Sequence, residues 1–317
     1  MPAVPISEIL APARAEGHAA AAFNVIGIEH AEAIVAGAEA AGVPVTLQLS
    51  QNCVDYHGGI EPVGRAMLAI AAAAAVPIAV HLDHATREDL VTRAVGLGFG
   101  SVMYDASTLP YADNVRATAA VAAWCHERGV WVEAELGEVG GKDGVHAPGA
   151  RTQPGEAVAY VAAAGVDGLA VAVGSSHAML TRDAVLDLPL IAELRAAVPV
   201  PLVLHGSSGV PDDALGAAVR AGLTKINIAT QLNKVFTAAV RGCLAGDPLL
   251  ADPRRYLRAG RAAVAAEVQR LTGVLGLTGV PGQAGVPGQA GVPGQAGVPG
   301  QAGVPGQAGA LEGDPAQ

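Results

Sequence analysis

The chain has 317 residues, of which 51% are hydrophobic and 3% aromatic, and its formal net charge is −10. This length is enough to bury one large core, and an α/β barrel of ~250 residues is an ordinary single domain. The acidic balance, with no cluster of lysine and arginine, argues against nucleic acid as a partner. No segment reads as a membrane span, because the longest apolar run, residues 66–80, is interrupted by Pro77.

The cysteines and the N-terminal residues indicate in which cell compartment the protein resides. Cys53, Cys125 and Cys243 are odd in number, widely spaced and outside any C-x-x-C motif. This usage fits a reduced cytosolic protein whose thiols are buried or inert. The first residues lack the basic segment and long apolar stretch of a signal peptide. We therefore predict a soluble, cytoplasmic protein with no membrane partner.

Strand-like apolar runs alternate with helical runs along the chain. A helix is expected at residues 29–41, another after Glu61, a third opened by Thr86 as its cap, and a last one at 252–271. Eight strands are predicted at residues 20–25, 44–50, 77–84, 101–107, 130–137, 168–174, 201–208 and 225–230. This order predicts an α/β fold, a (β/α)8 TIM barrel, with a doubly wound open sheet as the alternative.

Two segments depart from this alternation. Residues 137–157 form a long, glycine-rich, polar stretch directly after a predicted strand, which favours an active-site loop. After the last helix, GVPGQA repeats five times over residues 279–308, with glycine at every third position. That spacing is collagen-like, but the triplets are few and uncharged, so we expect a disordered tail. The predicted domains are a barrel at 1–272 and a tail at 273–317.

Three histidines stand at predicted strand ends, namely His84, His177 and His205. Any one alone is more typical of a hydrogen-bonded rim residue. Because the carboxyl ends of barrel strands converge on one face, three imidazoles there could hold a divalent metal with an open position. The repeated context favours the metal site.

Acidic residues occupy the same kind of position. Asp83 precedes His84, and Asp105 and Glu135 lie near the ends of the fourth and fifth predicted strands. Neighbours on a strand point to opposite sides, so Asp83 is expected to reach the site from the turn if His84 faces the metal. Lys225, at a strand start, is interpreted as structural.

Six motifs, HLDHA, SVMYDAS, EAELGEVGG, LVLHGSSG, KINIAT and DPRRYL, together resemble the zinc-dependent class II ketose-bisphosphate aldolases. The resemblance covers residues 1–272 and leaves out the tail. It implies reversible cleavage of fructose or tagatose 1,6-bisphosphate to dihydroxyacetone phosphate and glyceraldehyde 3-phosphate. It also implies Zn²⁺, a monovalent cation (Na⁺ or K⁺) and a homodimer or homotetramer.

The resemblance also implies a role for each matching residue. His84, His177 and His205 match the zinc ligands, and Asp105 and Glu135 match acids that hold the metal in an alternative position or bind a second one. Asp83 matches the acid that exchanges a proton with the C4 hydroxyl. The implied substrate-binding residues are Asn24, Ala178, Gly206, Ser207, Ser208, Asn227, Ile228, Ala229 and Thr230.

Several positions depart from the family pattern. Ala178 replaces a usual glycine, and Asp143 stands where a glutamate is expected to move the C3 proton. Arg182 could replace a lysine that many fructose-bisphosphate members carry. Ala229 favours the tagatose-bisphosphate branch of the family. Arg254 could approach a distal phosphate. These departures leave two alternatives open: an aldolase for another phosphorylated ketose, or a catalytically weakened barrel acting as a scaffold.

Two further possibilities concern the class of enzyme and one more histidine. A metal-dependent barrel hydrolase is disfavoured, because such enzymes commonly carry paired histidines on the first strand, which residues 20–25 lack. His81, two residues before Asp83, could orient an acid, or be a buried histidine without a mechanistic role.

Overall fold

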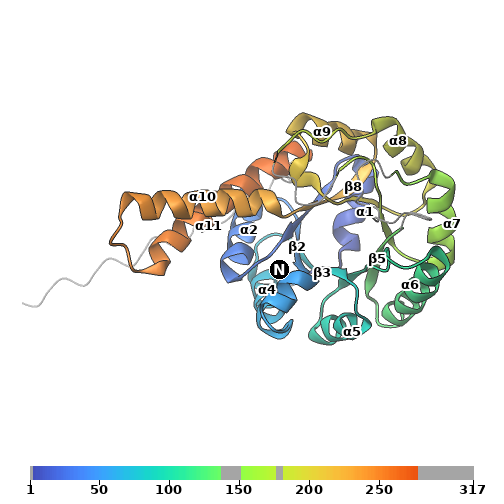
Figure 1. The fold of residues 1–317 in the computed structure, drawn as a ribbon, viewed down its shortest axis with the longest axis horizontal. Helices are drawn as coiled ribbons and strands as arrows, with labels where there is room; N and C mark the ends of the chain where they lie inside the picture. The colour runs from blue at the N-terminus through green and yellow to red at the C-terminus, as the bar shows by residue number, and fades with distance from the viewer. Residues whose placement is uncertain (1–2, 137–150, 176–180, 278–317) are drawn as a thin grey trace, which may run out of the picture. The chain divides into compact units, whose positions relative to one another are not determined.

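A closed barrel of eight parallel strands forms the centre of the protein (Figure 1). The computed structural model describes residues 3–136, 151–175 and 181–277. The strands are β1 (Ala20–Asn24), β2 (Val45–Ser50), β3 (Ile78–Ala85), β4 (Ser101–Tyr104), β5 (Trp131–Glu135), β6 (Gly168–Ala170), β7 (Leu202–Leu204) and β8 (Leu223–Ile228). Each strand pairs with the next, and β8 pairs with β1, so that Ala22 lies opposite Asn227. The predicted barrel is confirmed, and the open sheet is wrong because β1 and β8 close the ring.

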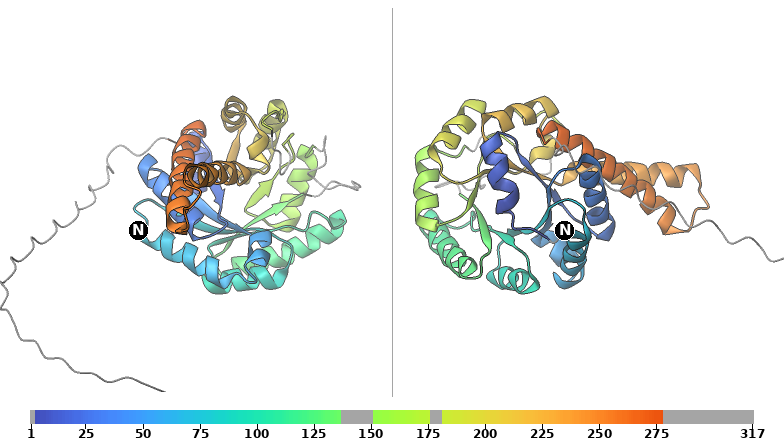
Figure 2. Two further views of the ribbon diagram at one scale, coloured as in Figure 1. Left: turned by 60° about the vertical axis from the view of Figure 1, so that its left-hand side comes forward. Right: turned by 180° about the vertical axis from the view of Figure 1, so that it is seen from behind.

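Helices surround the strands, as the two views in Figure 2 show. They are α1 (Ser7–Glu16), α2 (Ile28–Ala41), α3 (Gln51–Tyr56), α4 (Glu61–Ala73), α5 (Glu88–Leu97), α6 (Tyr111–His126), α7 (Pro154–Ala164), α8 (Leu188–Ala197), α9 (Asp212–Ala221), α10 (Thr230–Gly246) and α11 (Pro253–Val274). Apart from α1, these helices contribute buried residues to one large hydrophobic cluster that also contains strand residues. No helix of the described ranges is long and apolar enough to cross a membrane.

One expected helix cap, that of α5, differs from the structure. The helix α11 is capped by Asp252, whose side chain accepts a hydrogen bond from the Arg254 amide. Thr86 does not cap α5, which begins after Arg87 without a side-chain cap. Instead, the Thr86 amide donates to Gln51 Oε1 at 2.9 Å, and Gln51 Nε2 donates back to the hydroxyl at 3.0 Å. This contact between the start of α3 and the turn after β3 takes precedence over the local capping pattern.

The helix α1 closes the N-terminal end of the barrel. Its buried residues Ile9 and Leu10 cluster with Ala20 and Ala79, which lie at the starts of β1 and β3, and with Trp131 at the start of β5. Covering this end with apolar side chains keeps water out of the barrel from below. The functional face is therefore the opposite, C-terminal one.

The helices α2 and α11 approach each other closely at Gly37. A Cβ atom at this position would lie 2.5 Å from the carbonyl oxygen of Ala265 and 2.7 Å from Val268 Cβ. Only glycine fits without moving backbone. The helix α11 ends at Val274, and Leu275 and Leu277 are still buried in the core. The GVPGQA repeats lie outside the described residues.

The interior of the barrel is unusually polar. Thr46, Gln48, His81, Ser101, Glu133, Lys225 and Asn227 are all buried on the strands. Buried polar groups are costly unless they are paired, so a barrel of this kind must supply hydrogen-bond partners. Most of these side chains do have such partners, and the network leads to the C-terminal face.

Candidate active site

Asp83 and His84 both point into one cavity, although they are neighbours on β3. The pairing of β3 with β4 gains an extra residue between Leu82 and Ala85, which is a β-bulge. At this bulge His84 has a φ of +48°, in the left-handed region that L-residues rarely adopt. The bulge breaks the strict alternation of the strand, so the expectation that Asp83 reaches the site from a turn is wrong. Such strain costs about 1–3 kcal/mol and is typical of functional sites.

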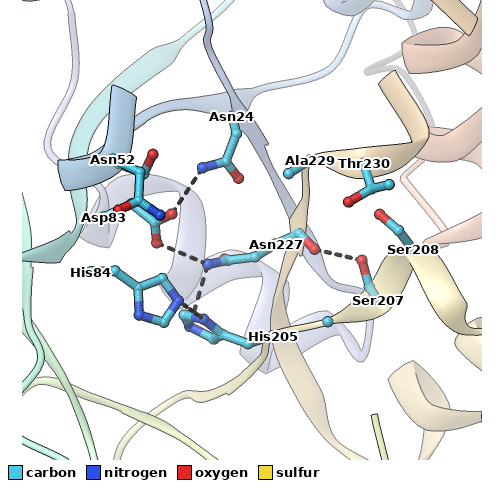
Figure 3. Close-up of a pocket in the computed structure, with 12 residues that line it drawn as sticks. Asn24, Asn52, Asp83, His84, His205, Ser207, Ser208, Asn227, Ala229 and Thr230 are labelled. Atoms are coloured by element: carbon cyan, nitrogen blue, oxygen red, sulfur yellow. Dashed lines mark hydrogen bonds between the residues drawn. The ribbon is translucent and has the colours of Figure 1, made fainter. Parts of the chain in front are cut away.

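The His84 and His205 rings lie edge to face, with their centroids 4.5 Å apart, on one side of this cavity (Figure 3). His84 Nε2 lies 2.7 Å from His205 Nδ1. The other nitrogen of each ring faces a carboxylate: His84 Nδ1 lies 2.9 Å from Asp105 Oδ2, and His205 Nε2 lies 2.9 Å from Glu133 Oε1. Protons donated to those carboxylates leave lone pairs at the two facing nitrogens. Two lone pairs that face each other at this distance repel unless a proton or a metal cation binds between them.

The charges around His84 favour a cation. Burial lowers the pKa of His84, but the negative charge of Asp83 and the hydrogen bond to Asp105 outweigh burial and raise the pKa to about 9. The pKa of Asp105 is held below its usual range, because the hydrogen bond and charge of His84 outweigh the effect of burial. In the metal-free chain, a proton on His84 therefore takes the place between the rings. A divalent metal would compete with that proton for the same lone pairs.

Asp83 is held by two asparagines. Asn24 Nδ2 donates to its Oδ2 at 2.8 Å, and Asn227 Nδ2 donates to its Oδ1 at 3.2 Å (Figure 3). Gln48 in turn donates to Asn24 Oδ1 at 2.7 Å, which fixes the orientation of that amide. Asp83 is 3% exposed, so its carboxylate is presented to the cavity in one defined orientation.

A turn of glycine and serine follows His205. Gly206 has a φ of +68°, which glycine adopts without strain, and it opens a 3-10 turn at Ser207–Gly209. The Ser207 hydroxyl donates to the carbonyl oxygen of Asn227, and Ser208 Oγ accepts from the Gln231 amide at 3.2 Å. These bonds dock the turn against the start of α10, where the positive end of the helix dipole favours an anion.

The cavity at this face has a volume of about 200 Å³. Asp83, His84 and His205 lie on one side, and the serine turn with the start of α10 lies on the other (Figure 3). It is lined by Asn24, Ser50, Asn52, Asp83, His84, His205, Gly206, Ser207, Ser208, Asn227, Ala229 and Thr230. The predicted residue Ile228 is buried in β8 and does not line the cavity. Two imidazole nitrogens that could hold a metal, beside a helix N-terminus that favours an anion, would suit a phosphorylated, carbonyl-bearing substrate.

The sequence matches the family model "Fructose-bisphosphate aldolase class-II" over residues 4–280. The chain belongs to this family. The YdjI aldolase from Escherichia coli K12 is similar, with 30% identity and a TM-score of 0.75, over 86% of this chain and 97% of that one. A candidate fructose-1,6-biphosphate aldolase from Coccidioides immitis is 29% identical with a TM-score of 0.76, over 86% and 96% of the two chains.

A third structure supports the fold alone. The fructose-bisphosphate aldolase Fba from Campylobacter jejuni is 23% identical, with a TM-score of 0.70 over 86% of this chain and 95% of that one. The resemblance seen in the motifs is therefore confirmed at the level of the class II aldolase family. An aldolase, which is a lyase, is the activity that this family supports.

Two acids of the aldolase pattern lie next to His84 but outside the cavity lining. Asp105 bonds to His84 Nδ1 and accepts from the Ser107 hydroxyl at 2.6 Å. Glu135 is 2% exposed, and burial together with the charge of Asp105 raises its pKa to about 8. Atoms of His84, Asp105 and Glu135 lie within 4.8 Å of one another, as do atoms of Asp83, His84 and His205. Two overlapping groups of side chains that could hold a metal ion thus share His84.

Three predicted residues of the aldolase site, Asp143, His177 and Ala178, lie outside the described residues. Arg182 is described, and its guanidinium bonds to the Val210 carbonyl oxygen and to Asp212. Its expected role as a replacement for a phosphate-binding lysine is not seen in this arrangement. Arg254 is highly exposed and bonds to Asp252, which supports the structural role of its helix start.

The sequence suggests His81 as a possible partner of an acid, but it indicates no role for Glu133, Ser50 or Asn52. His81 does not contact Asp83; its Nδ1 lies 2.9 Å from Ser101 Oγ, because period two directs it to a lower layer of the barrel. Glu133, two residues before Glu135, contacts His205, and that same period could have identified it. Ser50 and Asn52 line the cavity just after β2. Their position after a strand was the available signal, but serine and asparagine are also common caps and turn residues.

Proposed function

We propose that this class II aldolase reversibly cleaves a ketose 1,6-bisphosphate, of fructose or tagatose, to dihydroxyacetone phosphate and glyceraldehyde 3-phosphate with the help of Zn²⁺. The observation that carries the proposal is the convergence of two imidazole nitrogens, 2.7 Å apart, beside the buried carboxylate Asp83. On the other side of the same cavity lie the serine turn and the start of α10, where the helix dipole favours an anion.

The residues fit a zinc ion. His84 and His205 offer nitrogen lone pairs whose rings are oriented by carboxylates, the usual arrangement around a ligating histidine. His177 is proposed as the third ligand, and Asp105 and Glu135 as acids that hold the metal in an alternative position. When bound, the zinc would supply positive charge that stabilises the enediolate left by bond cleavage.

The substrate phosphate is proposed to bind at the start of α10 and the serine turn. Ser207, Ser208, Ala229 and Thr230 line that side of the cavity, and backbone amides at a helix N-terminus attract anions. Gly206, Asn227, Asn24 and Ala178 complete the proposed substrate-binding set. A monovalent cation, Na⁺ or K⁺, at the same turn remains a prediction from the family.

Two acids are proposed to move protons. In cleavage the C3–C4 bond breaks, Asp83 takes the proton of the C4 hydroxyl, and C4 leaves as the aldehyde carbon. The electron pair stays on the dihydroxyacetone phosphate half as its enediolate, and Asp143 is proposed to protonate C3. Asn24 and Asn227 hold both oxygens of Asp83, so the carboxylate meets the hydroxyl in one orientation.

A second candidate is an aldolase for a ketose with a single phosphate. No lysine or arginine is among the described residues that line the cavity. Arg182 is bonded to Asp212, and Arg254 to Asp252. A second phosphate would therefore have to find its cation outside the described lining, whereas Ser50 and Asn52 offer neutral polar contacts that suit a hydroxylated chain end.

The test is release of dihydroxyacetone phosphate from a panel of ketose phosphates by the purified, zinc-loaded chain. Fructose and tagatose 1,6-bisphosphates are compared with fructose and tagatose 1-phosphates, and Ser207→Ala serves as the phosphate-site variant. The proposal expects kcat/KM to be highest for a bisphosphate and to fall for the variant. A preference for a 1-phosphate favours the second candidate, and no cleavage of any member leaves the scaffold alternative.

Assembly and location remain family-level expectations. A dimer or tetramer is proposed because class II aldolases are typically oligomeric, and light scattering of the purified chain measures the mass directly. A cytoplasmic location agrees with the described helices, none of which is long and apolar enough to cross a membrane, and fractionation of expressing cells tests it.

A further inference from the structure

A buried ion pair lies directly beneath His205. Glu133 on β5 and Lys225 on β8 have fully buried side chains, and Lys225 Nζ donates to Glu133 Oε2 at 2.7 Å. The other carboxylate oxygen, Glu133 Oε1, lies 2.9 Å from His205 Nε2. Neither Glu133 nor Lys225 lines the cavity, so neither is placed to touch a substrate.

Two groups compete for His205 Nε2. The Glu133 carboxylate can only accept, and so requires a proton on Nε2, whereas Asn227 Nδ2 can only donate, and so requires a lone pair there. Asn227 Nδ2 is farther, at 3.3 Å, and already donates to Asp83. A hydrogen bond to a charged acceptor at 2.9 Å is shorter and stronger than a neutral one at 3.3 Å. The proton therefore belongs on Nε2, which leaves the lone pair on Nδ1.

Lys225 stabilises the Glu133 carboxylate in the buried interior of the barrel. A buried carboxylate without a counter-charge is strongly destabilising. His81 Nε2 is 3.9 Å from Glu133 Oε2, beyond hydrogen-bond distance, so the amine of Lys225 is the near donor to that oxygen. With Lys225 bonded to Oε2, the other oxygen, Glu133 Oε1, is the one that contacts His205.

We propose that Glu133, held by Lys225, is a positioning residue that fixes the Nε2–H tautomer of His205 and so presents Nδ1 to the divalent metal. The inference rests on the proposed function, because it assigns a role around the metal that the aldolase would use. It explains why an ion pair is kept where apolar side chains could fill the barrel. It also gives His205 the counterpart of the contact that Asp105 makes with His84.

The tautomer can be measured without altering the chain. In the full chain labelled with ¹⁵N-histidine, two-dimensional ¹H–¹⁵N NMR distinguishes protonated from unprotonated ring nitrogens, and His205→Ala identifies the signal. The proposal expects Nε2–H in the metal-free chain and Nδ1 as the metal-bound nitrogen after zinc is added. A proton on Nδ1 in the metal-free chain, or zinc on Nε2, would overturn it.

The second experiment measures zinc affinity by competition with a chromophoric chelator. The double variant Glu133→Leu/Lys225→Met removes both charges at similar volume, which usually preserves stability. We expect its Kd for zinc to rise about 10–100-fold, the usual effect of losing a carboxylate behind a ligating histidine. A Kd within threefold of the unaltered chain, in a folded variant, would show that the pair is structural only.

A matched control removes a carboxylate charge from another histidine pair. Asp167 Oδ2 lies 2.8 Å from His126 Nε2, on residues that do not line the cavity, so Asp167→Asn should leave the zinc Kd unchanged. If the double variant does not fold, the spectrum of the unaltered chain still decides the tautomer. Zinc binding without cleavage of any ketose phosphate contradicts the proposed function, whereas cleavage by a chain with Nδ1–H contradicts only this inference.

Discussion

Replacing Asp83 with asparagine tests the proposed proton transfer most selectively. The substitution keeps the shape of the side chain but exchanges one acceptor oxygen for an NH₂ donor. Both oxygens of Asp83 accept amide hydrogen bonds, from Asn24 at 2.8 Å and from Asn227 at 3.2 Å. In Asp83→Asn one of these donors therefore faces another donor in a site that is 3% exposed.

Two effects of different size follow. Loss of one buried hydrogen bond should lower the free energy of unfolding by about 1–3 kcal/mol, which leaves the chain folded. Loss of the proton acceptor should lower kcat by about 10²–10⁴-fold, the usual contribution of general acid–base catalysis. The assay couples dihydroxyacetone phosphate to an NADH-dependent reductase, and urea unfolding measures stability in parallel.

The control is Asn24→Ala, which removes one of the same hydrogen bonds but keeps the carboxylate. Its stability loss should resemble that of Asp83→Asn, while its loss of kcat should be at least tenfold smaller. Asp83→Asn with zinc bound and kcat within threefold of the unaltered chain would refute the assignment. Equal losses of kcat in the two variants would show that Asp83 acts through orientation alone.

Three further predictions concern packing, thiols and metal. Gly37→Ala forces a Cβ to 2.5 Å from a backbone oxygen of α11, so it should lower the free energy of unfolding in urea by about 1–3 kcal/mol. The matched helical variant Gly96→Ala, whose Cβ would have nothing within 4 Å, should leave stability unchanged or raise it. Equal changes in stability for the two variants would contradict the close packing at Gly37. Burial raises the pKa of the Cys53 and Cys125 thiols to about 11, so at pH 8 only about one in a thousand is thiolate. Iodoacetamide should therefore label the partly exposed Cys243 first in the native chain, and all three thiols in denaturant; early labelling of a buried thiol, read by mass spectrometry, would be inconsistent with this burial. Added zinc should raise the melting temperature in proportion to the logarithm of its concentration above Kd, whereas a melting temperature independent of zinc would count against a metal site in the folded chain.

The barrel could be predicted because its signals are local. Apolar runs of strand length, separated by helical stretches, appear in the sequence itself, and all eight predicted strands are present. The histidines His84 and His205 were found for a related reason, since each follows an apolar run at a turn. The acids Asp83 and Asp105 could be recognised from the same positions.

The contacts that organise the site could not be predicted, because they depend on neighbours distant in sequence. The bulge at His84 arises from how β3 pairs with β4, and alternation along one strand cannot reveal it. Glu133 and Lys225 are 92 residues apart, and only the closed barrel makes them partners. Thr86 fits the local pattern of a helix cap, but its amide bonds instead to Gln51 at the start of α3, which is 35 residues away in the sequence.

The most direct test of the account is aldol cleavage by the purified chain before chelation, after chelation and after zinc is returned. Fructose and tagatose 1,6-bisphosphates are assayed side by side, with metal content measured in each sample. The account predicts cleavage that chelation abolishes and that about one zinc per chain restores. Cleavage that persists in a metal-free sample would contradict the role given to His84 and His205.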